Sequence, residues 1–194
     1  MVLWLPMAVL AGSPGPRESA RSDILLEKIE PDPRGGKAYK LVYRIEAPLS
    51  AYWRFKTDFD NDFLESSPFI RQHRLVSRSM AGAITENRYT HAPDDFFRWR
   101  TTLSPQQHRM DFVLLNPAEV RQKFHYGYIQ LNALAQSTQV TQVAYFDFWG
   151  VSLWSAYPWG GGMTDFLTAT ARWEQKTMLR LKAHYQDPGP QNSD

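Results

Sequence analysis

The side chains of this sequence that are capable of acid–base chemistry lie inside aromatic or apolar segments. His125 falls in the middle of a predicted strand, Asp147 lies between two phenylalanines, and Glu174 lies beside the apolar stripe of a predicted helix. An imidazole and two carboxylates are groups that general acid–base catalysis uses. No motif brings the three together, so they are weak catalytic candidates. For His125 the more common arrangement is a hydrogen-bonded histidine within a sheet.

Four further charged residues share the faces of two predicted strands. Glu86 and Arg88 lie on one face of their strand, and Arg98 and Arg100 lie on one face of the next. Unpaired burial of such groups is costly, so we expect them to be paired or exposed. They are either polar anchors for the head of an amphiphilic ligand or a solvent-facing ladder of ion pairs on the convex surface of a sheet.

The sequence predicts no metal site. Asp58, Asp60 and Asp62 resemble the first ligands of a calcium loop, but Phe63 and Phe69 stand where that loop needs glycine and glutamate. The five histidines lack metal-binding spacing, and there is no cysteine. Nucleotide-binding and nucleophile motifs are also missing, so we expect no cofactor.

The composition describes an aromatic-rich, nearly neutral chain. Its 194 residues contain 22 Lys and Arg against 20 Asp and Glu, a formal charge of +2. A balance this even is not the basic footprint of a nucleic-acid-binding protein, so we expect no nucleic-acid partner. Aromatic residues are abundant, with 7 Trp, 9 Tyr and 11 Phe, and such side chains suit the lining of an apolar site.

The N-terminal residues 1–20 resemble a secretory signal peptide. Val2–Leu10 is apolar and small residues follow it, although no basic residue precedes Arg17. We therefore expect export to the periplasm or exterior, with a disordered tail on a cytoplasmic protein as the alternative. In residues 21–36 we expect a short helix and a linker, followed by one domain over residues 37–186 and a disordered tail over 187–194.

Periodicity predicts the elements of that domain. Lys37–Glu46 alternates as a strand, a helix that Ser50 caps follows Pro48, and a second short helix covers Asn61–Ser66. Met163–Gln186 has one apolar stripe at helical spacing, formed by Leu167, Ala171, Met178, Leu181 and Tyr185. Short turns separate the segments between, which predicts an antiparallel meander of strands near 70–79, 83–91, 96–103, 108–115, 122–134 and 138–149.

This order of elements resembles the helix-grip fold of the START-like (SRPBCC) superfamily, which includes START lipid-transfer domains, polyketide cyclases and coenzyme Q-binding proteins. The local likeness lies in Tyr43–Pro48 followed by Ala51–Trp53, in Thr138–Thr141, and in the single helix Met163–Gln186. The resemblance spans residues 37–186. It implies an α+β fold in which a curved, seven-stranded antiparallel sheet wraps around the long helix and leaves a cavity for an apolar molecule.

Under that resemblance, the long helix and the last two strands line the cavity. The helix offers Phe166, Thr170, Trp173, Thr177 and Leu181 along one side. From the strands we expect either Tyr126, Tyr128, Phe146 and Phe148, or the opposite face with Ile129, Val143 and Tyr145. Both faces are apolar, so the sequence leaves this open.

The segment between the last strand and the long helix is rich in aromatic residues. It contains Trp149, Trp154, Tyr157 and Trp159, followed by three glycines. One interpretation is a gate that opens the cavity and touches a membrane or a bulky ligand, because Trp and Tyr suit such interfaces. The alternative is that these rings fold back and complete the core.

The resemblance, together with the abundant aromatics, favours a carrier or sensor that binds an apolar or amphiphilic molecule; the ligands it implies are a lipid, a quinone, a polyketide or a similar molecule. Transient membrane contact would accompany that role. One alternative is a cavity enzyme of the polyketide cyclase or aromatase type, and another is a protein-interaction domain with a vestigial cavity. An enzyme would need His125, Asp147 or Glu174 to reach the same cavity.

Overall fold

The computed structural model describes residues 24–61, 64, 67–90, 92–149 and 162–186. The predicted signal segment, the C-terminal tail and the gate residues Trp154, Tyr157 and Trp159 lie outside these residues. The second predicted short helix, Asn61–Ser66, falls mostly outside them as well.

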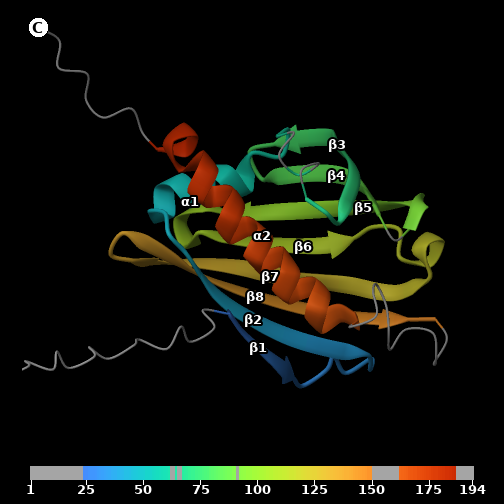
Figure 1. Cartoon of the computed structure of the whole chain (residues 1–194). Helices are drawn as coiled ribbons and strands as arrows, with labels where there is room; N and C mark the ends of the chain where they lie inside the picture. The colour runs from blue at the N-terminus through green and yellow to red at the C-terminus, as the bar shows by residue number, and fades with distance from the viewer. Residues whose placement is uncertain (1–23, 62–63, 65–66, 91, 150–161, 187–194) are drawn as a thin grey trace, which may run out of the picture.

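The described chain forms one curved antiparallel sheet with a long helix across its concave face (Figure 1). The strand order is β1-β2-β8-β7-β6-β5-β4-β3. The strands are β1 (Ile24–Ile29), β2 (Lys37–Ile45), β3 (Ile70–Ser79), β4 (Gly82–Tyr89), β5 (Ala92–Ser104), β6 (Arg109–Leu114), β7 (Gln122–Leu134) and β8 (Ser137–Phe148). The helices are α1 (Leu49–Thr57) and α2 (Gly162–Tyr185), with short 3-10 turns η2 (Pro105–Gln107) and η3 (Ala118–Val120). The predicted meander is confirmed, and so are the helix after Pro48 and the long C-terminal helix.

The prediction of a helix before residue 37 is wrong. Ile24–Ile29 is strand β1, which pairs with β2 from Ile24↔Tyr43 to Ile29↔Ala38. Ile24 and Leu26 pack against the core, whereas Leu25 between them is 53% exposed, which is the alternation of a strand. Six residues are too few for a helical period to be told from a strand period. The sheet therefore has eight strands instead of seven.

Helix α1 begins directly after Pro48, which is the residue at its N-cap, instead of at the predicted cap Ser50. Tyr52 N–H donates to Pro48 O at 3.0 Å. Proline has no N–H to continue a strand ladder, and β2 has already ended at Ile45, three residues before it. The turn places Tyr52 and Phe55 against the core.

The core lies between the concave face of the sheet and the two helices. The predicted stripe of α2 is confirmed, because Leu167, Ala171, Met178 and Tyr185 are buried. They pack against Leu41, Tyr43, Ile45, Ala47, Ala51, Tyr52, Phe55, Met110, Leu131 and Val140. Each fully buried large apolar side chain contributes about 1.5–3 kcal/mol, so this contact fixes α2 on the sheet. Neither helix in the described ranges has the length and apolarity needed to cross a bilayer.

Candidate functional site

A cavity of about 280 Å³ lies between α2 and the concave face of the sheet. Strands β3 to β8 form its floor, and α1, the segment after α1 and α2 form its other walls. Apolar residues make up most of the lining: Phe59, Leu64, Phe69, Ile70, Tyr89, Trp99, Met110, Phe112, Ile129, Ala144, Met163, Phe166, Leu167 and Trp173. The polar and charged lining residues are Lys56, Ser67, His73, Thr85, Asn87, Thr101, His125, Gln142, Thr170 and Glu174.

Neither predicted set of strand residues lines the cavity as a set. His125 pairs with Phe146 and Ile129 pairs with Gln142, so odd positions of β7 share a face with even positions of β8. The concave face therefore contains Ile129 from one predicted set and Phe146 and Phe148 from the other. The prediction is wrong for Tyr126, Tyr128, Val143 and Tyr145, which lie on the convex face. Of the seven residues, Ile129 lines the cavity and the buried Phe146 packs beside it, against His125.

Helix α2 places three of its five predicted residues on the cavity. Phe166, Thr170 and Trp173 line it. Thr177 does not, because it is 1% exposed and packed inside the protein one turn further along. Leu181 packs against the core cluster instead.

Glu174 is the centre of a buried polar cluster at the side of the cavity. Its Oε2 accepts hydrogen bonds from the hydroxyls of Tyr43, at 2.5 Å, and Tyr52. Its Oε1 accepts a hydrogen bond from Lys56 Nζ at 2.7 Å. Side-chain exposures of 7% for Glu174 and 16% for Lys56 make this an ion pair largely removed from water. Three elements, β2, α1 and α2, therefore meet at one carboxylate.

The electrostatics of the cluster keep Glu174 ionised. Burial acts to raise the pKa of Glu174, but the charge of Lys56 and the three hydrogen bonds outweigh it and hold the pKa below its usual value. Burial, followed by the charge of Glu174, raises the pKa of Tyr43 and Tyr52 well above their usual value. Both phenols therefore stay protonated and act as donors.

Sequence reasoning missed three members of this cluster. Tyr43 appeared only as one residue of an alternating strand, and Tyr52 only as the aromatic of a short helix. Lys56 carries no signal at all, since nothing distinguishes it from the other lysines until α1 packs on α2. The apolar surroundings of Glu174 were the only visible hint.

His125 lines the cavity among aromatic rings. Trp99, Phe112 and Phe146 surround it with ring centroids 4.9, 6.2 and 5.4 Å away. Its Nδ1 lies 3.2 Å from Gln122 Oε1, so Nδ1–H donates and Nε2 keeps a lone pair. Burial lowers the pKa of His125 to about 3, and the ring is neutral at physiological pH.

The three catalytic candidates do not come together. His125 and Glu174 line the same cavity, but Asp147 lies on the side of β8 that carries Tyr145 and pairs with Lys123 at 2.7 Å. His73, which the sequence analysis did not single out, also lines the cavity. Its ring nitrogens lie 2.7 Å from Asn87 Oδ1 and 2.8 Å from Phe59 O, so it links β3 and β4 to the segment after α1.

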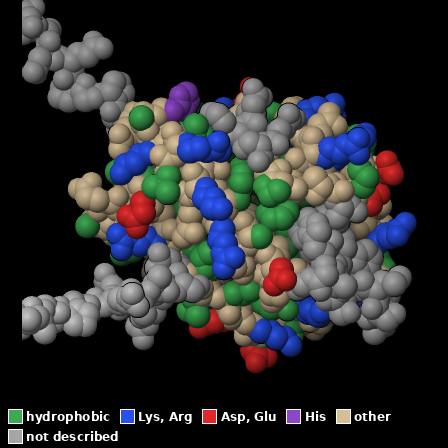
Figure 2. Space-filling view, in the orientation of Figure 1, with side chains coloured by type: hydrophobic (Ala, Val, Ile, Leu, Met, Phe, Trp, Pro, Cys, Tyr) green, Lys and Arg blue, Asp and Glu red, His purple; other side chains and the backbone are tan. Residues whose placement is uncertain are grey.

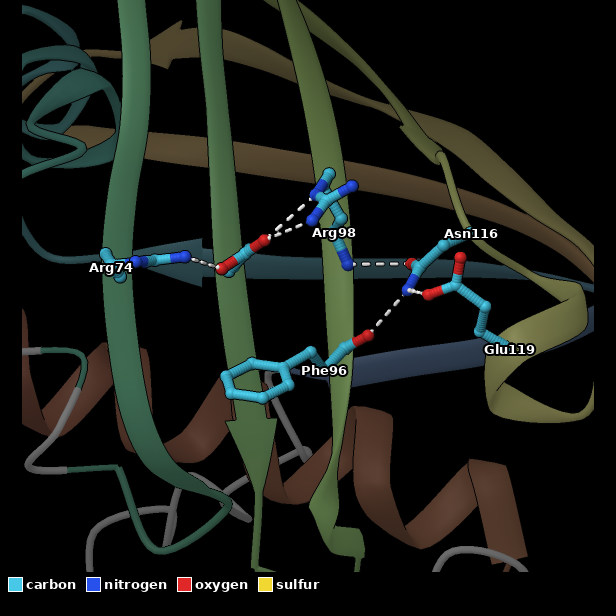
Figure 3. A network of polar contacts seen from close by, with 6 residues as sticks. Arg74, Phe96, Arg98, Asn116 and Glu119 are labelled. Atoms are coloured by element: carbon cyan, nitrogen blue, oxygen red, sulfur yellow. Dashed lines mark hydrogen bonds and ion pairs between the residues drawn. The ribbon is translucent and has the colours of Figure 1, made fainter.

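The four predicted polar anchors lie on the face of the sheet away from the cavity. Trp99 and Thr101 line the cavity, so their neighbours Arg98 and Arg100 point to the convex side. There Glu86 is bound by Arg74 and, at 2.7 Å, by Arg98, which approach one carboxylate from both sides (Figure 3). For Glu86 and Arg98 this agrees with the cross-strand ion pairs of the second interpretation, except that Glu86 is 5% exposed and therefore buried instead of facing solvent.

The same network continues to the neighbouring strands. Hydrogen bonds from Arg74 and then from Arg98 hold the pKa of Glu86 below its usual value. Asn116 accepts from the Arg98 backbone N–H at 2.9 Å and donates to Glu119, as Figure 3 shows. Arg88 lies over the ring of Phe96, 3.7 Å from its centroid. These contacts stiffen the outer face of β3, β4 and β5.

Among the described residues, no group of three His, Cys, Asp or Glu side chains is placed to hold a metal ion. Asp58, the first residue of the calcium-like run, accepts a hydrogen bond from Tyr185 at 2.7 Å and so ties the end of α1 to the end of α2.

Trp149, the one described residue of the predicted gate, is 59% exposed beside Lys123. Its backbone N–H donates to Arg121 O at 3.2 Å.

Comparison with known proteins identifies the fold. No family model and no curated protein sequence matches the chain. Solved structures do match. A START superfamily protein from Mycobacterium smegmatis has a TM-score of 0.59 at 12% identity, over 76% of this chain and 99% of its own.

Two further structures match over similar lengths. An aromatase/cyclase from Streptomyces sp. R1128 has a TM-score of 0.57 at 13% identity, over 76% of this chain and 96% of its own. Norcoclaurine synthase from Thalictrum flavum has a TM-score of 0.55 at 10% identity, over 90% of this chain and 99% of its own. The eight-stranded antiparallel sheet, the long C-terminal helix across it and these matches together show that the chain has a helix-grip fold like that of these structures.

Proposed function

We propose that the protein binds a small, largely apolar molecule in the cavity between α2 and the sheet, as a carrier or sensor. The observation that supports this is the cavity itself, which is walled by aromatic and aliphatic side chains with a few polar groups among them. Apolar walls with a small number of placed polar groups are the usual composition of a small-molecule site. The structural neighbours include a START superfamily protein and an aromatase/cyclase, which agrees with such a role.

The size of the cavity limits the ligand. A volume of about 280 Å³ is just below the range of roughly 300–1,000 Å³ that is typical of ligand pockets. We infer a molecule with up to about three rings, or one short chain, in preference to a lipid with two long chains.

An enzyme is the second candidate, because His125 and Glu174 line one cavity. A general acid or base works best with a pKa near the working pH. The pKa of His125 is about 3, and the pKa of Glu174 lies below its usual value. Glu174 also already accepts three hydrogen bonds. We therefore favour binding without turnover.

Binding of N-phenylnaphthylamine, which fluoresces in apolar surroundings, tests this proposal. Thr101→Phe places a ring in the cavity and should abolish the signal. Thr102→Phe is the matched control, since Thr102 is exposed and is the next residue of β5, on the other face. Equal dye binding by wild type and both variants would rule out the cavity as the site. Incubation of a bound apolar molecule with the protein, followed by liquid chromatography and mass spectrometry, separates the two candidates, because only an enzyme would convert it into a product of different retention time or mass.

We also propose transient contact with an anionic membrane through the outer face of α2. Arg172, Lys176 and Arg180 are exposed there at intervals of four residues, and Figure 2 shows basic side chains along this face. Each basic residue close to an anionic leaflet contributes about 1 kcal/mol. Sedimentation with phosphatidylserine vesicles should detect binding that weakens in high salt and in a triple serine variant, with neutral vesicles as the control.

A further inference from the structure

Two buried polar atoms on the cavity side of α2 have no hydrogen-bond partner. They are Nε1 of Trp173 and Oγ1 of Thr170, and neither meets a donor or acceptor within the described part of the chain. Both side chains line the cavity. Buried polar groups in folded proteins are nearly always hydrogen-bonded, because an unsatisfied one destabilises the fold. Two of them side by side at a cavity point to a partner outside the described residues, such as a bound molecule.

The two atoms belong to one polar patch. Thr170, Trp173 and Glu174 lie three and four residues apart, so they share one face of α2. Lys56 joins them through its hydrogen bond to Glu174. An ammonium group has three N–H donors, and within the described chain Glu174 is the one acceptor that Lys56 contacts. The patch therefore offers more free donors than acceptors.

The charges of the patch cancel. Lys56 and Glu174 are 2.7 Å apart and form a neutral pair, and His125 across the cavity is uncharged. A ligand carboxylate at this patch would bring a second negative charge close to Glu174, where Lys56 is already paired, and a ligand ammonium would meet Lys56. The site therefore favours an uncharged molecule that supplies a hydrogen-bond acceptor.

We propose that the ligand is an uncharged apolar molecule with a hydroxyl or carbonyl oxygen, which accepts hydrogen bonds from Trp173 Nε1–H and the Thr170 hydroxyl. This inference rests on the proposed function and deepens it. The oxygen satisfies the two orphaned groups, while the aromatic rings of the cavity enclose the apolar body. In the empty protein the two unsatisfied groups lower the stability of the fold, and a bound ligand oxygen removes this cost.

Three naphthalene-based probes with a common apolar body test the proposal by displacement of N-phenylnaphthylamine. Naphthol and acetylnaphthalene present a neutral hydroxyl and a neutral carbonyl, and naphthoate presents a carboxylate. Naphthalene itself is the reference. In the wild-type protein we expect either neutral oxygenated probe to bind more tightly than naphthalene, and naphthoate to bind most weakly of all.

Two conservative variants remove the proposed donors without touching the ion pair. Trp173→Phe and Thr170→Val should each weaken naphthol and acetylnaphthalene on the order of tenfold relative to naphthalene. Thr177→Val is the matched control. Its Oγ1 is also buried without a partner in the described chain, but its side chain does not line the cavity. This variant should bind all probes as the wild type does.

The stability of the empty variants gives a readout without ligand. Thr170→Val removes an unsatisfied buried hydroxyl, so the unliganded variant should be at least as stable as wild type in urea. The inference is overturned if the variants weaken naphthalene and its oxygenated forms equally, or if naphthoate binds best. If the dye binds the wild-type protein but no oxygenated probe displaces it better than naphthalene, the inference alone is overturned; if the dye does not bind at all, the proposed function fails as well.

Discussion

Lys56 on α1 and Glu174 on α2 form a buried ion pair, with 2.7 Å between Nζ and Oε1, although they are 118 positions apart in the chain. The pair joins the first helix to the last one at the side of the cavity. Tyr43 of β2 and Tyr52 of α1 donate to the same carboxylate. The position of α2 over the sheet therefore depends on one side chain of β2 and two of α1, all more than 100 residues away in the chain.

Removal of the cation should destabilise the protein strongly. Lys56→Met leaves the Glu174 carboxylate buried and uncompensated, which costs about 3–5 kcal/mol in comparable pairs. Urea denaturation measures the loss. Arg44→Met is the control, because the Arg44–Glu46 pair is more than half exposed on both sides and should contribute less than about 1 kcal/mol. Equal effects of the two substitutions would mean that the buried pair is not important for stability.

The stability of the protein should fall as the pH falls from about 7 to about 5, before most carboxylates titrate. The pKa of His125 is lowered by burial, so the unfolded chain takes up a proton in this range and the folded protein does not. That difference favours unfolding by up to about 1.4 kcal/mol per pH unit. Urea denaturation across this range measures it.

His125→Phe should flatten this pH dependence, because the substituted ring does not titrate. His184→Gln, at the exposed end of α2, is the control and should keep the wild-type slope. If the pH dependence of stability persists in His125→Phe and disappears in His184→Gln, its attribution to His125 is wrong.

Gly127→Ala should lower the stability and also disturb the cavity. A Cβ at Gly127 would lie 2.0 Å from Val143 O and 2.8 Å from Cζ of Phe112, a ring that lines the cavity. Overpacking of this kind costs about 1–3 kcal/mol. Denaturation and dye binding measure the two effects separately.

Gly35→Ala is the comparison for this substitution. Gly35 has a φ of 97° with nothing close to its Cβ position, so alanine there should lower stability through backbone strain and leave dye binding unchanged. Normal dye binding by Gly127→Ala would show that Phe112 does not need to move.

Glu86→Ala distinguishes a structural ladder from a ligand anchor. The substitution leaves Arg74 and Arg98 without their shared acceptor, so stability should fall by about 1–3 kcal/mol. Dye affinity should stay at the wild-type value, because Glu86 lies on the other face of the sheet from the cavity. If dye binding by Glu86→Ala falls by more than the fraction of folded protein does, Glu86 takes part in ligand binding after all.

Periodicity predicted the meander, α1 and α2, because long strands and helices repeat their pattern often enough to be recognised. The sequence could not predict which side chains of β7 and β8 face the cavity, and the reason lies in the hairpin loop between the two strands. The hairpin pairs Leu134 with Ser137, so its loop is the two residues Ala135 and Gln136. A strand start at residue 138 implies a loop one residue longer, and a slip of one residue transfers every side chain to the other face.

That loop lacks the residues by which such turns are recognised. Two-residue hairpins prefer Asn-Gly or similar pairs, because the backbone needs a positive φ there. Here Ala135 adopts a φ of 42°. The Lys56–Glu174 pair was hidden for a different reason, since it exists only after α1 and α2 pack. Local patterns therefore predicted the elements, and the tertiary contacts decided which side chains form the site.

The pairing of β2 with β8 has a consequence for how the chain is made. The register runs from Lys37↔Phe146 to Ile45↔Thr138, so one side of β2 finds its neighbour only after β8 has been synthesised. At about 5–20 residues per second, a ribosome needs several seconds to add the intervening chain. During that time the β1–β2 hairpin lacks the strand and the helix that later cover it. Completion of the sheet is thus a late step, and a nascent chain released before β8 would expose the unpaired edge of β2 to other proteins.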